Sequence, residues 1–239
     1  MAFDERSHPN NKYTLVALLN SNRGRLILLS ILLFIPILNY LQEVISTISG
    51  RSKSNEYQTN LPLFEAVKSN NLNTVQSLLD NPTTPYNPNA EDDEGITPLI
   101  EATLLGNYEM VSFLISKGAT AQPSPGFRHT PLRAACLTAN TQLISYLLQL
   151  GADPNALSDG NRTPLMGCCF LRPEFDSKPN KGELSLKAVQ VMMRDEKTDP
   201  TVRNSFGESA LDLCRERGYV ESVAYLEERI AEWNDKMHR

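Results

Sequence analysis

The amino-acid sequence predicts an all-α protein in which a solenoid of stacked helical repeats follows a separate hydrophobic helix. Three Thr-Pro-Leu tripeptides begin at residues 97, 130 and 163, so their starts are 33 residues apart each time. A period of that length indicates a repeat architecture, because one helix pair buries its apolar face only by stacking on the next. The hydrophobic helix is predicted by the segment LILLSILLFIPIL at residues 26–38, in which Ser30 and Pro36 are the only interruptions.

The hydrophobic segment divides the N-terminal quarter of the chain into three parts. We expect a polar tail at residues 1–25, a hydrophobic helix at 26–48 and a polar linker at 49–60. The fully apolar part has about 16 residues, or roughly 24 Å of helix, against a hydrocarbon core of about 30 Å. Counting on through Ile45 makes the helix long enough, so a single transmembrane helix is the prediction. A helix packed on protein or lying at the interface, and a cleaved segment, are the alternatives.

Looser copies of the tripeptide extend the series to five repeats, which begin near residues 61, 97, 130, 163 and 209. A small residue lies five positions after each start, where it lets neighbouring first helices come close: Ala66, Ala102, Ala135, Cys168 and Cys214. Threonine at the start suits a helix N-cap, and the proline after it suits the first helical turn. Each repeat is therefore expected to be a turn followed by two antiparallel helices.

This pattern resembles the ankyrin repeat, whose motif begins T-P-L-H-x-A. The resemblance covers residues 61–239 and implies an ankyrin-repeat solenoid that holds another protein and does not catalyse a reaction. Repeat four carries an insertion at residues 172–183, which is polar and is expected to project into solvent. The motif histidine is replaced in every repeat, so its hydrogen bonding is expected to be weaker here; the replacements are Phe64, Ile100, Arg133, Met166 and Asp212.

Charge and cysteine content exclude several classes of protein. The formal net charge is −5, and the acidic excess lies in residues 61–239, which argues against a nucleic-acid partner. The four cysteines form no CxxC pair, so zinc-ligand spacing is absent. Cys168 and Cys169 are adjacent, and we expect all four cysteines to be buried, reduced thiols in a cytosol-like compartment.

Catalytic motifs are missing from the sequence. It contains no GxSxG, Walker, GxGxxG or HExxH motif. Its three histidines, His8, His129 and His238, fall in the two tails and in a turn, with no partner suggested for acid–base work. We therefore predict a protein that is not an enzyme and uses no cofactor or metal.

Candidate partner-binding residues lie at the two positions that follow the small pair of each first helix, which line the groove in ankyrin proteins. These positions are largely apolar in the central repeats, where they hold Leu104, Leu105, Leu137, Phe170 and Leu171. An apolar patch rimmed by charge indicates an interaction site, although the insertion or the N-terminal segment could cover it. The finger-like turns before the helices add Phe127, Arg128 and Phe206, since aromatic residues dominate binding hot spots.

The leading hypothesis is a non-catalytic module that is tethered to a membrane through residues 26–48 and recruits or scaffolds a protein in its groove. The expected location is a membrane crossed once, with the repeats in the cytosol or another reducing compartment; an organellar membrane is the alternative. A second hypothesis is an accessory subunit of a membrane complex. A third is a soluble regulator whose apolar helix docks on its own solenoid.

Overall fold

The computed structural model describes residues 57–81, 83, 86–122 and 129–237, which form one compact unit. These residues are helical apart from turns and one isolated antiparallel bridge between Ser158 and Arg162. The predicted transmembrane helix at 26–48 lies outside the described residues. Among the helices of the described ranges, none is both long enough and apolar enough to cross a membrane.

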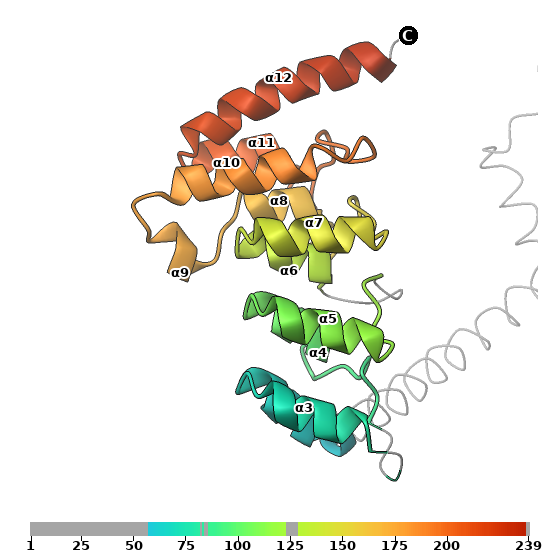
Figure 1. Ribbon diagram of the computed structural model, residues 1–239. Helices are drawn as coiled ribbons and strands as arrows, with labels where there is room; N and C mark the ends of the chain where they lie inside the picture. Colours follow the sequence, from blue (N-terminus) through green and yellow to red (C-terminus); the bar gives the residue numbers. More distant parts are fainter. Residues whose placement is uncertain (1–56, 82, 84–85, 123–128, 238–239) are drawn as a thin grey trace, which may run out of the picture. The chain divides into compact units, whose positions relative to one another are not determined.

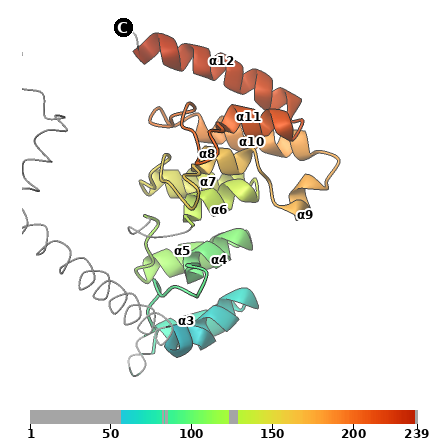
Figure 2. The same ribbon diagram turned by 180° about the vertical axis from the view of Figure 1, so that it is seen from behind.

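The helices pair into the five expected repeats, which lie one on the next in chain order (Figures 1 and 2). The first helices are residues 57–68, α4 (Pro98–Leu104), α6 (Pro131–Leu137), α8 (Pro164–Cys168) and α11 (Ala210–Glu216). The second helices are α3 (Leu72–Leu79), α5 (Tyr108–Ser116), α7 (Thr141–Gln149), α10 (Lys181–Met192) and α12 (Val220–Met237). A short additional helix, α9 (Pro173–Asp176), lies in the insertion of repeat four.

In repeats two to five, the first helices begin where the sequence predicts because a side chain caps each of them. Thr97, Thr130 and Thr163 each accept a hydrogen bond from the backbone N–H three residues later, and proline follows at the first helical position. In repeat five, Ser209 and Asp212 form a reciprocal capping box. A cap of this kind contributes about 1 kcal/mol, so the register of each repeat is encoded locally.

Repeat one departs from the expected boundaries. Residues 57–60, which the sequence assigned to the linker, are already helical, and Pro62 lies inside the helix instead of at its start. The assignment of these four residues to the linker is therefore wrong. The Leu-Pro-Leu copy lacks the capping threonine that fixes the start of the helix in repeats two to four.

Small residues allow the first helices to pack closely, as the motif predicts. Ala102 and Ala135 are completely buried in a core that runs through the repeats. The tightest approach is at Gly167 in α8, where an added Cβ would lie 3.1 Å from Cβ of Cys136 and 3.2 Å from the carbonyl oxygen of Arg133. Helices α6 and α8 can therefore approach this closely only because position 167 has no side chain.

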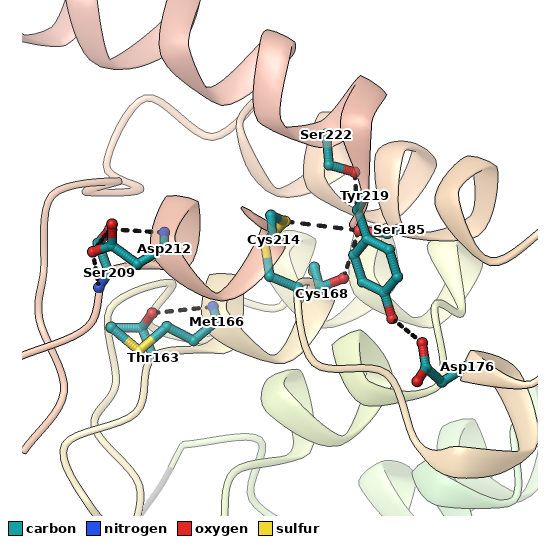
Figure 3. Close-up of a disulfide and its surroundings, with 11 residues drawn as sticks. Thr163, Met166, Cys168, Asp176, Ser185, Ser209, Asp212, Cys214, Tyr219 and Ser222 are labelled. Carbon is teal, nitrogen blue, oxygen red and sulfur yellow. Dashed lines mark hydrogen bonds between the residues drawn. A yellow bond between two sulfur atoms is a disulfide. The ribbon is translucent and has the colours of Figure 1, made fainter. Parts of the chain in front are cut away.

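A disulfide joins the first helices of the last two repeats. Cys169 bonds to Cys214, and their Cα atoms are 4.7 Å apart (Figure 3). The expectation of four reduced thiols is therefore wrong for this pair, while Cys136 and Cys168 are free and buried. Position 169 is the second small position of repeat four and 214 is the first of repeat five, so stacking brings together two residues that are 45 apart in sequence.

The insertion of repeat four lies at one side of the stack in Figure 1, and none of its residues 172–183 is buried, as expected for a segment that projects into solvent. It is nevertheless bound to neighbouring repeats at two points. The Arg172 N–H donates to the Leu137 carbonyl at 2.9 Å. The buried Tyr219 hydroxyl donates to Asp176 at 2.7 Å (Figure 3), and Arg217 and Lys181 pair with the same carboxylate.

Candidate functional site

The predicted partner-binding residues are only partly on the surface. Leu105, Phe170 and Phe206 are 45%, 42% and 73% exposed, and Leu104 and Leu137 are half-buried. Leu171 is only 2% exposed and belongs to the core, so its inclusion among the surface residues is wrong. The next residue, Arg172, donates its N–H to the Leu137 carbonyl at 2.9 Å, so the chain at this point is bound to repeat three. Phe127 and Arg128 lie outside the described residues.

An apolar cavity of about 250 Å³ opens between the first helices of repeats two and three and the turns before them. Its floor is a cluster separate from the main core, made of Ile96, Ile100 and Ala134 with Leu104 packed against them. Leu137 also lines it, and its polar rim is Glu101, His129 and Arg172. Leu104 and Leu137, two of the predicted residues, therefore share one cavity.

A second cavity, of about 260 Å³, lies between repeats three, four and five. Phe170 and Phe206, predicted from different repeats, both line it. An arginine accompanies each ring: the guanidinium carbon of Arg217 is 3.9 Å from the Phe170 centroid, and that of Arg162 is 5.9 Å from the Phe206 centroid. The remaining lining residues are Arg133, Arg162, Met166, Asn204, Glu208, Leu213 and Glu216.

Among the residues that line this cavity, Arg133 has the most unusual environment for a charged side chain. It is only 7% exposed, and its buried Nε has no hydrogen-bond partner among the described residues. Its Nη1 lies 3.4 Å from Nδ1 of His129, the one hydrogen-bond contact of this guanidinium within the described part of the chain. Burial, together with the charge of Arg162, lowers the pKa of Arg133 to about 10. Burial and the charge of Arg133 likewise lower the pKa of His129, which favours the neutral imidazole that accepts this hydrogen bond.

The contact between His129 and Arg133 joins the two cavities, because the histidine lines the first and the arginine lines the second. We call the surface formed by both cavities and by Leu105 the groove. Sequence analysis did not predict that the side chains at the fourth position of the T-P-L-H-x-A motif line the groove. Ile100, Arg133 and Met166, which replace the motif histidine, all line its cavities. The missing histidine was therefore the available signal, but it was interpreted only as weaker hydrogen bonding.

Ankyrin-repeat models match two parts of the sequence. A model of three ankyrin repeats matches residues 36–124, and a single-repeat model matches residues 127–159. Together the two ranges cover just over half of the chain.

The chain belongs to the ankyrin-repeat family. Ankyrin repeats are protein–protein interaction modules and are generally not enzymes, so this chain carries such a module. A search of curated proteins gives no match.

The match to the ankyrin family differs from the predicted domain boundaries at both ends. It begins at residue 36, within the hydrophobic segment, although the first repeat was expected near residue 61. Repeats four and five lie beyond both matched ranges, yet α8 and α10–α12 complete the same stack of helix pairs. Across the ankyrin residues that the structure describes, no group of three or more His, Cys, Asp or Glu side chains is placed to hold a metal ion.

Proposed function

We propose that this chain binds a protein partner in the groove and holds it at a membrane. The observation that carries the proposal is the apolar cluster of Ile96, Ile100, Ala134 and Leu104, which lies apart from the core and opens into a cavity of about 250 Å³. An apolar floor with a polar rim is the arrangement of a protein-binding surface. The exposed side chains of Leu105 and Phe170 extend this surface along the first helices.

The membrane tether is proposed from residues 26–48 alone. Their hydropathy supports a single-pass anchor with the repeats on one side of the membrane. Reduced cysteines were the argument for a cytosol-like compartment, but the bond between Cys169 and Cys214 is of a kind that persists in oxidising compartments. Alkaline carbonate extraction tests the anchor, and protease protection of sealed vesicles then assigns the side that holds the repeats.

Two alternatives predict different outcomes. An accessory subunit of a membrane complex should fail to accumulate when its complex is absent, whereas a recruiter should persist alone. A soluble regulator whose apolar helix docks on its own solenoid should be released by carbonate. The start of the ankyrin match at residue 36 favours this last alternative over a purely lipid-facing segment, because residues 36–60 carry part of the family pattern.

Groove binding can be tested with a matched pair of leucines. Leu105 and Leu150 are the C-cap residues of α4 and α7, and they are 45% and 44% exposed. Neither lines a cavity, but Leu105 directly follows Leu104 of the first cavity, whereas Leu150 ends a second helix and adjoins no residue of either cavity. We expect a photo-crosslinking amino acid at position 105 to capture a protein in the cell of origin, and the same amino acid at position 150 to capture none. Equal capture at both positions would place the partner elsewhere.

Charge substitutions give an independent test of the same surface. Leu137→Asp and Phe170→Asp should abolish capture, because each places a carboxylate in an apolar contact. The helical circular dichroism signal and the melting temperature should stay close to wild type, since neither side chain is fully buried. Leu150→Asp is the control for an added charge. Loss of folding in the groove variants would show that these residues stabilise the fold instead of binding a partner.

A further inference from the structure

The second cavity is lined by charged residues of both signs, which come from different repeats. Arg133, at the start of α6, and Arg162, in the turn before α8, come from repeats three and four. Glu208 and Glu216 come from repeat five. An anion that enters the cavity therefore finds two guanidinium groups on repeats three and four.

The two arginines differ from their neighbours in lacking a carboxylate partner. Arg203, Arg215 and Arg217 each form an ion pair. Neither Arg133 nor Arg162 forms one with any residue that the structure describes, and Arg133 keeps an unpartnered Nε although it is 93% buried. Asp159 acts on Arg133 electrostatically but forms no ion pair with it. A buried cation without a directly bonded counter-charge is unfavourable, and a charged group with a perturbed pKa in a cleft is a candidate for a binding site.

The walls of this cavity are apolar and aromatic. Met166, Phe170, Phe206 and Leu213 line it beside the charged groups. A side chain that enters would therefore contact rings and aliphatic carbon as well as the guanidinium groups. Desolvation by these walls strengthens an ion pair that forms inside.

We propose that this cavity binds a carboxylate group of the partner polypeptide, adjacent to an apolar or aromatic side chain. The carboxylate pairs with Arg133 and Arg162, and the apolar neighbour packs on Phe170 and Phe206. This inference rests on the proposed function and specifies the chemistry of the protein that the groove receives.

A carboxylate is expected to fit better than a phosphate because it costs less to remove from water. The two arginines attract, and Glu208 and Glu216 repel, a dianion about twice as strongly as a monoanion, so these charges do not by themselves discriminate between the two anions. The Born cost of desolvation grows with the square of the charge, so it is about four times larger for a dianion than for a monoanion in the same cavity. The site is therefore expected to be selective for a single negative charge.

Three small probes of similar shape test this selectivity on the full-length chain: 3-phenylpropionate, its neutral analogue 3-phenylpropanamide, and phenyl phosphate. We expect the carboxylate to bind about tenfold more tightly than the amide, which corresponds to one charge-assisted hydrogen bond. Phenyl phosphate should bind more weakly than the carboxylate. Chemical shifts of the Phe170 and Phe206 amides, followed by NMR, would place the probe in this cavity.

Arg133→Met is the decisive variant, and Arg194→Met is its control. Arg194 is exposed and lines neither cavity. Arg133→Met should abolish the preference for carboxylate over amide, whereas Arg194→Met should retain it. Equal affinity for the two probes in the wild type would overturn the proposal, as would a preference that survives Arg133→Met or a tighter phosphate complex.

Capped peptides distinguish a side-chain carboxylate from a chain terminus. The pair is an amidated peptide with an internal Glu-Phe and a peptide that ends in a free Phe carboxylate; an amidated Gln-Phe peptide is the neutral reference. Tighter binding of either acid than of the reference supports the site and identifies the source of the carboxylate. Equal binding of all three would refute it. Crosslinking at position 105 does not depend on this charge, so capture there without carboxylate selectivity would refute this inference alone.

Discussion

Replacement of Arg133 by methionine should stabilise the free protein. The pKa of Arg133 falls to about 10, roughly 2.5 pKa units below the ordinary value of arginine. Each pKa unit corresponds to about 1.4 kcal/mol, so the folded state disfavours the charged guanidinium by roughly 3 kcal/mol. The side chain is only 7% exposed, so screening by solvent reduces this figure little. Methionine keeps an unbranched apolar side chain without the charge, and buried charges replaced in this way often give a more stable protein.

The pH dependence of the free energy of unfolding provides a second test of this prediction. A basic group whose folded-state pKa is lowered binds protons less readily in the folded state than in the unfolded state. Its destabilising effect is therefore complete at every pH below the folded pKa of about 10, and it is relieved only as pH rises through that value. Arg133 also lowers the pKa of His129, so the comparison belongs above the ordinary pKa of histidine. The difference between Arg133→Met and wild type should consequently be the same at pH 8 and pH 9.

Urea unfolding of both proteins measures the difference, with Arg194→Met as the surface control. We expect the free energy of unfolding to rise by about 1 to 3 kcal/mol at an unchanged m-value, because the lost contact with His129 offsets part of the gain. A variant less stable than wild type would refute the reasoning, because the guanidinium would then be net stabilising. A residue that costs stability but is needed for binding is typical of a functional site.

Three further predictions concern the fold. Replacing Cys169 and Cys214 by alanine should lower the free energy of unfolding by about 4 kcal/mol, because the disulfide closes a loop between residues 45 apart in sequence and so restricts the unfolded chain. Urea unfolding curves of the wild type that coincide with and without reductant would contradict the bond. Ala139 has φ 51° in the turn between α6 and α7, so Ala139→Gly should stabilise by about 1 kcal/mol, and a lower melting temperature would contradict this. Tyr219→Phe removes the hydrogen bond that lowers the pKa of Asp176. That stabilisation is present above the unfolded pKa near 3.8 and is lost as pH falls through the lower folded value, so the stability difference should shrink in acid; a constant difference would contradict it.

Local sequence was sufficient to predict the repeats. The starts at Thr97, Thr130 and Thr163 are fixed by a side chain that hydrogen-bonds within its own first turn, which is an interaction over three residues. The same local rule failed where the cap is missing, since the helix of repeat one includes residues 57–60. Most of the predicted groove residues line the cavities because a given motif position lies on the same face of the stack in every repeat; they are Leu104, Leu137, Phe170 and Phe206.

The sequence by itself therefore determined the family, the register of the repeats and most of the groove positions, since these follow from short-range capping and from a period of 33 residues. Tertiary structure alone decided which residues meet across repeats. It buried Leu171 in the core, and it bonded Cys169 to a cysteine 45 residues away. It also left the buried Nε of Arg133 without a hydrogen-bond partner among the described residues, although Glu208 and Glu216 line the same cavity. Burial and charge pairing depend on every residue that lies nearby in space, including residues from other repeats, and the spacing of a motif along the chain does not specify those neighbours.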